Sequence, residues 1–339
     1  MIRVALDLLG GDHAPESVVD GALLVDEPDV EILLVGPVDV AERLLAARGA
    51  SGRFPLVAAS QVVGMDEDPA KAVRAKRDAT VRVAARLVRD GKADAMVSVG
   101  STGAALAAAV FTLGRLRGMS RPALAAIIPA KAGPLVFLDA GAGTEATPEL
   151  LAQFALAGAA LASVRLGLDH PRVGLLSIGE EPGKGDELRK AAHVALAALP
   201  ITFVGNVEGR DVPYGGRADV VVTDGFTGNV LAKGLEGAAT MLTEVMLAAL
   251  TATPELRTAS AALLPVLAET TARMSPEALG GAVLLGVGGV VVVGHGASTP
   301  QGVVSCIRVA AQAAREGLVP RLAEALSDLL DRTRAETVT

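Results

Sequence analysis

The sequence is poor in aromatic residues and in cysteine. It contains six Phe, one Tyr and no Trp in 339 residues. Proteins that bind single-stranded nucleic acid stack the bases on aromatic side chains, and 31 Lys and Arg against 38 Asp and Glu leave a net charge of −7. This composition argues against a nucleic-acid partner. The single cysteine, Cys306, cannot form an intrachain disulfide, which is typical of proteins from reducing compartments.

The sequence also lacks the pattern of a signal peptide or a transmembrane helix. The N-terminal segment reaches Asp7 too early for a signal peptide. Residues 95–114 carry no charge, but Gly100-Ser101-Thr102-Gly103 interrupts them and predicts a strand, a turn and a helix. We therefore expect a soluble, cytoplasmic protein that can associate peripherally with a membrane.

Hydrophobic residues are abundant, at 51%, and they alternate between short β-branched runs and longer Ala- and Leu-rich stretches. Continuous apolar runs are typical of strands buried on both faces of a parallel sheet. The expected strands are Arg3–Leu8, Glu31–Val35, Leu56–Ala58, Ala95–Val99, Ala123–Ile128, Leu135–Asp139, Val173–Ile178, Thr202–Val204, Val220–Thr223 and Val290–Val293. The expected helices are Pro15–Val25, Pro69–Arg89, Gly103–Leu113, Pro148–Leu166, Asp186–Ala198, Pro300–Glu316 and Pro320–Arg334. This alternation predicts a doubly wound, mainly parallel α/β fold in one unit over residues 1–339.

One segment departs from this alternation. Residues 230 to about 278 show no strand signal and form two helical stretches around Thr253-Pro254, which predicts a helical hairpin. The turn region Leu247–Ala262 is apolar, with little charge. We expect part of the hairpin to lie in a homodimer interface and its tip to touch a membrane surface. The tip leucines are Leu250, Leu256, Leu263 and Leu264.

Glycine-bearing loops follow six of the expected strands. They lie at residues 10–15, 100–103, 179–185, 205–209, 224–229 and 294–298. Ligands of open parallel sheets bind at the carboxyl ends of the strands, where helix N-termini present free N–H groups. We expect the six loops to converge on one sheet edge and to hold phosphate or another oxyanion. The sequence has no P-loop, dinucleotide-binding glycine motif or zinc-ligand spacing, so we expect no metal or cofactor.

A basic segment begins after Asp68-Pro69, a pair typical of a helix start. It contains Arg74, Lys76 and Arg77. Lys71, Arg74 and Arg77 recur on one broad helical face, and on spacing alone this would be a solvated face.

These loops, with the basic segment, resemble those of the bacterial PlsX-type phosphate acyltransferases of phospholipid synthesis. The matching stretches share their order and cover nearly the whole chain. They are residues 7–15, 68–76, 102–104, 121–124, 184–185, 205–211, 220–229, 280–282 and 295–298. The sequence departs from the family pattern in places: Ser101, Ser177 and Gly143 stand where Asn is common, and Ala79-Thr80 replace a Ser pair.

The resemblance implies a fold similar to that of phosphotransacetylases and isopropylmalate dehydrogenases. It also implies an activity that converts an acyl-carrier-protein thioester and inorganic phosphate into acyl phosphate and free carrier protein. The product would feed a membrane glycerol-3-phosphate acyltransferase. Arg74, Lys76 and Arg77 become candidates for docking the acidic carrier protein.

Phosphate is already an anionic nucleophile, so positioning and electrostatic stabilisation can supply most of the rate. We expect Lys184 to balance the phosphate charge, and His13 or His295 to donate to the carbonyl oxyanion or the leaving sulfur. The candidate phosphate- and substrate-binding residues are Gly10, Gly11, Asp12, Ser101, Thr102, Gly103, Asn206, Asp224, Thr227, Gly228, Asn229 and Ser298.

Two other interpretations remain open. An isopropylmalate-type NAD dehydrogenase would have the same fold, but it would need clustered Asp residues for Mg²⁺. A non-catalytic module that binds carrier protein or lipid would explain the apolar hairpin, but not the six polar loops.

Overall fold

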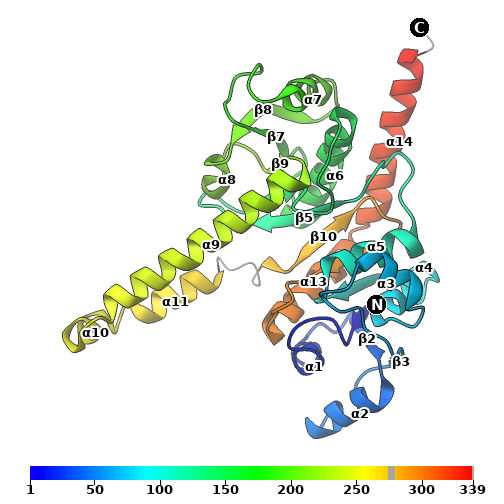
Figure 1. The fold of residues 1–339 in the computed structure, drawn as a ribbon, viewed down its shortest axis with the longest axis vertical. Coiled ribbons are helices and arrows are strands. Elements are labelled where there is room, and N and C mark those ends of the chain that lie inside the picture. Colours follow the sequence, from blue (N-terminus) through cyan, green and yellow to red (C-terminus); the bar gives the residue numbers. More distant parts are fainter. Residues whose placement is uncertain (274–278, 338–339) are drawn as a thin grey trace.

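The computed structural model describes residues 1–273 and 279–337. Its centre is a sheet of eleven strands in the order β3-β2-β1-β4-β11-β10-β5-β6-β9-β7-β8 (Figure 1). The strands are β1 (Ile2–Asp7), β2 (Val30–Gly36), β3 (Leu56–Ala58), β4 (Ala95–Ser98), β5 (Ala123–Ile128), β6 (Leu135–Leu138), β7 (Arg172–Ser177), β8 (Thr202–Glu208), β9 (Val220–Val222), β10 (Ala282–Leu285) and β11 (Val290–Val293).

Helices cover both faces of this sheet. The described helices are α1 (Glu16–Leu23), α2 (Val38–Ala47), α3 (Pro69–Ala75), α4 (Thr80–Arg89), α5 (Thr102–Leu113), α6 (Pro148–Leu166), α7 (Glu187–Ala197), α8 (Asp211–Tyr214), α13 (Pro300–Arg315) and α14 (Leu318–Thr337), together with α9 (Gly225–Leu250), α10 (Pro254–Ser260) and α11 (Leu264–Arg273), which extend away from the sheet. Helix α13 contacts β1, β4 and β11 from one face, while α4 contacts β1 and β4 and α5 contacts β11. The predicted doubly wound α/β class is confirmed.

The strands are buried on both faces, as their continuous apolar runs predict. In β1, Val4 and Leu6 belong to one core cluster and Ala5 belongs to another. All three side chains are fully buried. Because successive side chains of a strand point to opposite faces, a single apolar run supplies both cores.

Strand direction reverses in the middle of the sheet. Strands β3, β2, β1, β4 and β11 are mutually parallel, β10 is antiparallel to β11 and β5, and β5 is antiparallel to β6. Strands β6, β9, β7 and β8 are again mutually parallel, and therefore run opposite to the first group. We call the part around β1–β4 and β11 the first lobe, and the part around β6–β9 the second lobe.

This reversal corrects the expectation that six loops share one sheet edge. The sequence analysis missed β10, whose apolar run is separated from β11 by a short Gly-rich turn. Gly286 in that turn has a φ of 88°. Because β10 is antiparallel to both β11 and β5, those two strands stay parallel to each other, and the second lobe is reversed at the antiparallel β5–β6 pair. The loops after β1, β4 and β11 form one group, and those after β7 and β9 form another. The expected loop 205–209 is wrong, because β8 continues to Glu208 and pairs with β7 through these residues.

The single helix expected over Pro69–Arg89 is also wrong, because the chain breaks between α3 and α4. The segment between them pairs with residues 60–61: Thr80 N–H donates to the Gln61 carbonyl at 2.9 Å, and the Asp78 carboxylate accepts from the Ser60 hydroxyl at 2.7 Å. Arg82 closes the end of α3 by donating to the Val73 carbonyl at 2.8 Å. The sequence analysis missed α2 and α8 as well.

Helix α6 is long and apolar enough to cross a membrane, but 67% of its apolar window is buried inside the protein. It contacts β6, β7 and β9 and packs beside α7 and α14. Its length and hydrophobicity are therefore those of a core helix.

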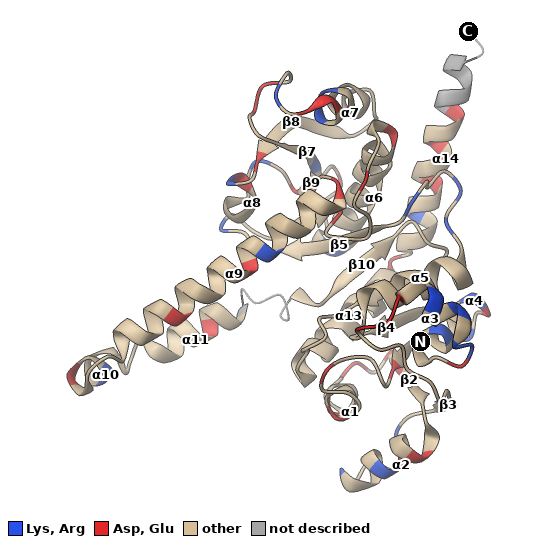
Figure 2. Ribbon diagram, in the orientation of Figure 1, with Lys and Arg blue, Asp and Glu red and all other residues tan. Residues whose placement is uncertain are grey.

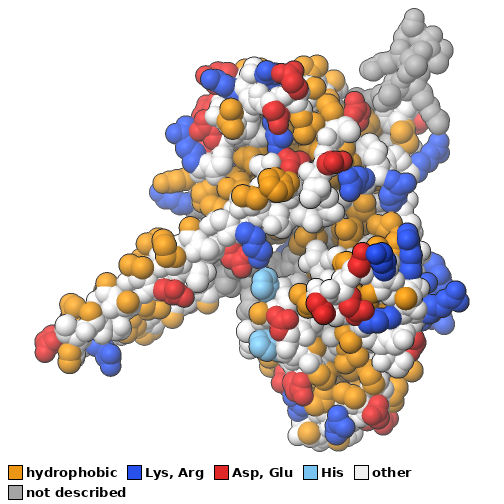
Figure 3. Space-filling view, viewed as in Figure 1, with side chains coloured by type: hydrophobic (Ala, Val, Ile, Leu, Met, Phe, Trp, Pro, Cys, Tyr) orange, Lys and Arg blue, Asp and Glu red, His pale blue; other side chains and the backbone are white. Residues whose placement is uncertain are grey.

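The predicted hairpin projects from the body as an arm of α9, α10 and α11 (Figure 1). Helix α9 begins at Gly225, earlier than expected, and α10 turns from it by 112°. The last part of the predicted hairpin, residues 274–278, lies outside the described residues. Large apolar side chains are exposed along the arm, and Figure 3 shows them on its visible face.

Candidate functional site

The loops that follow β1, β4 and β11 touch one another in the first lobe. The Asp12 N–H donates to the Gly296 carbonyl at 2.8 Å. A Cβ atom on Gly10 would lie 2.9 Å from the Gly100 nitrogen, and a Cβ on Gly11, where φ is 112°, would lie 3.1 Å from the Val99 carbonyl oxygen. Glycine is required here because neighbouring backbones come too close for a side chain.

Asp7 lies beneath these loops, beside a cavity of about 120 Å³ that Gly10, Thr80 and Ser101 help to line. Its side chain is almost fully buried, and its carboxylate accepts from the Ser98 hydroxyl at 2.7 Å. Burial raises the pKa of Asp7, although hydrogen bonds from Thr80 and Ser98 oppose the shift. Asp7 is absent from the predicted set of site residues, although it begins a matching stretch.

Helix α5 starts at this cavity, with Ser101 as its N-cap. The Ser101 hydroxyl accepts from the Ala104 N–H at 3.3 Å, which is the usual role of Ser at this position. A Cβ on Gly103 would lie 2.6 Å from Cγ of Pro69, so the first turn of α5 packs against the start of α3. Thr102 and Gly103 are half-buried here.

The two candidate histidines differ in their surroundings. His13 is exposed, whereas His295 accepts from the Ala297 N–H through Nδ1 at 3.2 Å. This bond places the proton of a neutral ring on Nε2, which lies 4.0 Å from the Glu236 carboxylate of α9. Ser298 is buried, and its hydroxyl donates to the His295 carbonyl at 2.6 Å. Ser298 therefore stabilises the conformation of the loop after β11, and His295 lies close to Glu236 of α9.

In the second lobe, the N-terminus of α9 packs tightly against the loop after β6. Cβ atoms on Gly225 and Gly228 would lie 2.1 Å from the Gly143 carbonyl oxygen and 1.9 Å from the Asp139 carbonyl oxygen, respectively. The Asn229 side chain donates to the Ala140 carbonyl at 3.1 Å. Gly228 thus permits close packing, and Asn229 ties the loop to the helix.

Asp139 organises that loop from within. Its carboxylate accepts backbone N–H groups of Leu124, Gly141, Ala142 and Gly143 at 2.8–3.0 Å. Burial raises the pKa of Asp139, and the four N–H groups oppose the shift. Gly143, one of the departures from the family pattern, leaves room for Arg121, whose Nη2 would lie 3.3 Å from a Cβ there.

Asp224 and Thr227 form the first turn of α9, as the sequence predicts. The Asp224 carboxylate caps the helix by accepting the Thr227 N–H at 2.9 Å. Burial raises the pKa of this carboxyl, but hydrogen bonds from Thr227 and the charge of Arg189 outweigh it, so that the pKa lies below its usual value.

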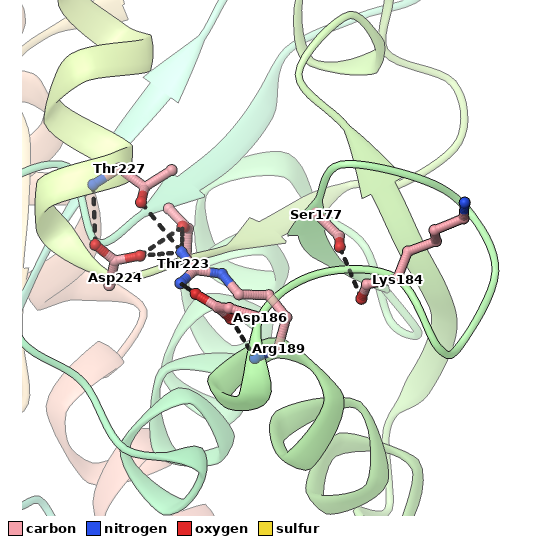
Figure 4. Close-up of polar contacts among 7 residues, drawn as sticks. All are labelled: Ser177, Lys184, Asp186, Arg189, Thr223, Asp224 and Thr227. Carbon is pink, nitrogen blue, oxygen red and sulfur yellow. Dashed lines mark hydrogen bonds and ion pairs between the residues drawn. The ribbon is translucent and has the colours of Figure 1, made fainter.

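Arg189 of α7 completes this turn, and the sequence analysis missed it. Its Nη2 contacts the Asp224 carboxylate and donates to the Thr227 hydroxyl at 3.1 Å, while Nη1 donates to Asp186 at 3.0 Å (Figure 4). Its side chain is 12% exposed. Only the sequence spacing of Asp186 and Arg189, three residues apart at a helix start, hinted at the pair.

Lys184 and Asn206 do not join this cluster. Figure 4 shows the Lys184 side chain pointing away from Arg189 and Asp224, with its carbonyl oxygen accepting from the Ser177 hydroxyl at 3.2 Å. Asn206 is fully buried and donates to the Glu181 carbonyl at 2.8 Å, while its side-chain oxygen lies 3.1 Å from the His193 ring. Asn206 therefore anchors the loop that carries Lys184.

The basic segment lies on α3 and just after it, beside further Lys and Arg of α4 (Figure 2). The Arg74 guanidinium lies over the Phe111 ring, 4.4 Å from its centroid. Lys76 pairs with Glu67 and donates to the Val62 carbonyl at 2.8 Å, whereas Arg77 is exposed. Arg74 and Arg77 are thus the more accessible cations. Within the described ranges, no group of three or more His, Cys, Asp or Glu could hold a metal ion.

The family model described as "Fatty acid synthesis protein" matches residues 2–321 of this chain. A phosphate acyltransferase of Desulfitobacterium hafniense is 43% identical over 327 residues, covering 96% of this chain and 98% of the relative. A phosphate acyltransferase of Heliobacterium modesticaldum is 44% identical over 326 residues, covering 95% and 97%.

Two solved structures share the fold. A phosphotransacetylase from Streptococcus pyogenes aligns with a TM-score of 0.62 at 18% identity, covering 93% of this chain and 94% of the other. A branched-chain phosphotransacylase from Enterococcus faecalis aligns with a TM-score of 0.58 at 17% identity, covering 93% and 99%.

Proposed function

Since the chain belongs to the fatty acid synthesis protein family, we propose that it transfers the acyl group of an acyl-carrier-protein thioester to inorganic phosphate. A phosphate oxygen forms a bond to the thioester carbonyl carbon, and the carbon–sulfur bond breaks. The sulfur leaves as a thiolate, which takes up a proton on the carrier protein. The products are acyl phosphate and free carrier protein.

The first turn of α9 is the observation that supports a phosphate site best. Its leading N–H groups have no partner within the helix, and the helix dipole favours an anion there. The half-buried Thr227 hydroxyl adds a side-chain donor. The Asp139 loop fixes the position of this turn through its contacts with Gly225 and Gly228.

The roles of the other polar residues follow from where they lie. Lys184 is exposed on a flexible four-carbon side chain, so it can reach toward a bound phosphate without losing a structural contact. His295 lies beside α9, with Nε2 4.0 Å from the Glu236 carboxylate, and is one candidate to donate to a developing oxyanion. His13 belongs to the same loop group and is the alternative donor. The glycine loops and the α5 N-terminus, with Ser101 and Thr102, would hold the rest of the substrate.

We further propose that the acidic carrier protein docks on the basic segment. Arg74 and Arg77 are exposed there, and their segment packs beside the α5 N-terminus through Gly103 and Pro69. Docking at this place would bring the thioester close to the first-lobe loops. Lys76 contributes less, because Glu67 already neutralises it.

The arm supports a proposal of homodimerisation and of peripheral membrane contact. Along α9, Leu242 and Val245 are 57% and 59% exposed, and at the tip Leu256 and Leu263 are 46% and 60% exposed. Such apolar surface is rarely left without a partner. A tip at the bilayer surface would release a long-chain acyl phosphate next to a membrane glycerol-3-phosphate acyltransferase that consumes it. Leu250 and Leu264 are half-buried within the arm, so they would contribute less.

Release of free thiol from acyl-carrier protein, measured with and without phosphate, tests the proposed reaction. We expect thiol release to require phosphate and to produce acyl phosphate in equal amount. Release without phosphate, or no release, would contradict it. Absorbance in the nicotinamide band, with NAD and a 2-hydroxy acid, tests the dehydrogenase interpretation in the same samples.

A further inference from the structure

One guanidinium joins the N-caps of two helices in the second lobe. Asp186 caps α7 by accepting the Arg189 N–H at 2.8 Å, and Asp224 caps α9 by accepting the Thr227 N–H at 2.9 Å. The side chain of Arg189 contacts both of these carboxylates (Figure 4). Helix α7 follows β7 and α9 follows β9, so Arg189 links two loops of the same site.

The Asp224 carboxylate poses a problem for a phosphate site. It lies at the helix end that would bind the anion, and its negative charge would repel phosphate at this short range. Its side chain is only 8% exposed, so water screens the charge poorly. A positive charge in direct contact is needed to cancel this repulsion, and Arg189 supplies it.

Thr227 poses a second problem, because its hydroxyl has only one hydrogen. That hydrogen can be donated to the nearby Asp224 carboxylate or to a ligand, but not to both. Arg189 competes with the Thr227 hydroxyl for the Asp224 carboxylate, because its Nη2 contacts that carboxylate and also donates to the Thr227 oxygen at 3.1 Å. With the Arg189 N–H on its oxygen, the Thr227 hydroxyl can turn its hydrogen from Asp224 to a phosphate oxygen when the ligand binds.

We propose that Arg189 is a positioning residue of the phosphate site, which neutralises the Asp224 cap and leaves the Thr227 hydroxyl free to donate to a phosphate oxygen. This inference rests on the proposed function. It assigns Arg189 no contact with the reacting atoms. A guanidinium suits the role because its planar donors reach Asp186, Asp224 and Thr227 together, which an ammonium cannot do in the same geometry.

The test separates the phosphate KM from the carrier-substrate KM and from kcat in steady-state kinetics. We expect Arg189→Met to raise the phosphate KM at least tenfold, with a small change in the KM for acyl-carrier protein. The phosphate KM of Arg189→Lys should lie between that of Arg189→Met and that of the wild type.

A rescue experiment distinguishes this role from a merely structural one. Asparagine still caps a helix but carries no charge, so adding Asp224→Asn to Arg189→Met should bring the raised phosphate KM most of the way back to the wild-type value. Arg172→Met is the matched control, because Arg172 pairs with Asp219 in the same lobe at the start of β7. It should lower thermal stability and leave the phosphate KM unchanged.

The inference would be overturned if folded Arg189→Met and Arg189→Lys had the wild-type phosphate KM. It would also be overturned if Asp224→Asn did not lower the raised phosphate KM of Arg189→Met. Both outcomes leave the proposed function intact as long as the wild type needs phosphate for thiol release. Loss of that phosphate requirement in the wild type would instead contradict the proposed function itself.

Discussion

The side-chain amide of Asn229 donates to the carbonyl oxygen of Ala140 at 3.1 Å and thereby ties the first turn of α9 to the loop that Asp139 organises. The same amide was predicted from the sequence to bind phosphate directly. In the structure it binds the 139–143 loop instead. Direct phosphate binding and loop anchoring predict different outcomes for the same substitution.

Asn229→Ala should loosen the 139–143 loop and raise the phosphate KM about tenfold, the size of one lost hydrogen bond of roughly 1–1.5 kcal/mol. Hydrogen exchange at Gly141–Gly143 should become faster in this variant. Thr240→Ala, on the exposed part of the same helix, is the control and should change neither quantity. A raised phosphate KM with unchanged exchange would favour direct phosphate binding, and two unchanged values would remove Asn229 from the site.

The buried Asp7 predicts a pH effect on stability. Burial raises the pKa of this carboxyl above its ordinary value of 3.8, so the folded protein keeps the Asp7 proton at a pH where the unfolded chain has lost it. The Asp7 contribution to the free energy of unfolding is therefore fully present below pH 3.8 and declines as the pH rises through the folded pKa.

The measurement is urea unfolding of wild type and Asp7→Asn over a pH series from about 4 to 8. Asparagine does not titrate, so the stability of the wild type relative to Asp7→Asn should fall with rising pH. A difference that is constant, or that increases with pH, would show that the Asp7 pKa is not raised.

Much of the fold follows from local pattern, because each buried strand and each amphipathic helix carries its own signal. The relative directions of the strands do not follow from local pattern. They depend on whether neighbouring strands pair parallel or antiparallel, which no local pattern shows. Both β5 and β6 were predicted, but their antiparallel pairing, which turns the second lobe against the first, was not.

The site residues also differ in whether a local pattern predicts them. Asp224 and Thr227 are predictable because a helix cap is a local motif. Asp139 and Arg189 act through contacts with segments distant in the sequence: Asp139 reaches Leu124 on β5, and Arg189 reaches α9. Burial of a charged side chain distinguishes such residues, and burial is a property of the folded chain.

Lys184 carries a prediction about catalysis. Within the described part of the chain, no hydrogen bond or ion pair holds its ammonium, and the side chain is exposed and points away from the Arg189 cluster (Figure 4). Lys184→Met should therefore keep the stability of the wild type and reduce kcat about tenfold to a thousandfold, the range for one lost charge-stabilising contact. Lys190→Met, an exposed residue of α7 that pairs with Glu187, is the matched control. Normal turnover in Lys184→Met would make Lys184 a solvated loop residue.

The docking proposal predicts a salt-dependent defect. Charge reversal at Arg74 and Arg77 should raise the KM for acyl-carrier protein, most strongly at low ionic strength, because an exposed patch acts by long-range attraction that salt screens. Activity with a small thioester mimic should remain near that of the wild type. Arg43→Glu, an exposed charge reversal on α2, controls for net charge. Equal losses with both substrates would place Arg74 and Arg77 in the phosphate site instead.

The arm predicts how the protein meets a membrane. Glu255 and Arg257 are the charges of the predicted turn region 247–262, so adhesion should depend on apolar insertion more than on anionic lipid. Burying one leucine side chain contributes roughly 1.5–3 kcal/mol, and a carboxylate in its place adds a desolvation cost. Leu256→Glu and Leu263→Glu should each lower the fraction of protein that floats with fluid liposomes at least tenfold. Both residues are exposed at the tip, so neither change should disturb the fold.

Val194→Glu supplies the comparison for these tip variants. Val194 is 71% exposed on α7, in the body of the protein, so the substitution adds the same charge at an exposed apolar position away from the arm. It should float like the wild type with neutral and with anionic liposomes. If the wild type does not float, or if the tip variants float as well as Val194→Glu, the apolar surface of the arm serves the partner subunit alone. Sedimentation equilibrium of Leu242→Glu, midway along α9, would then show whether a dimer depends on the apolar surface of the arm.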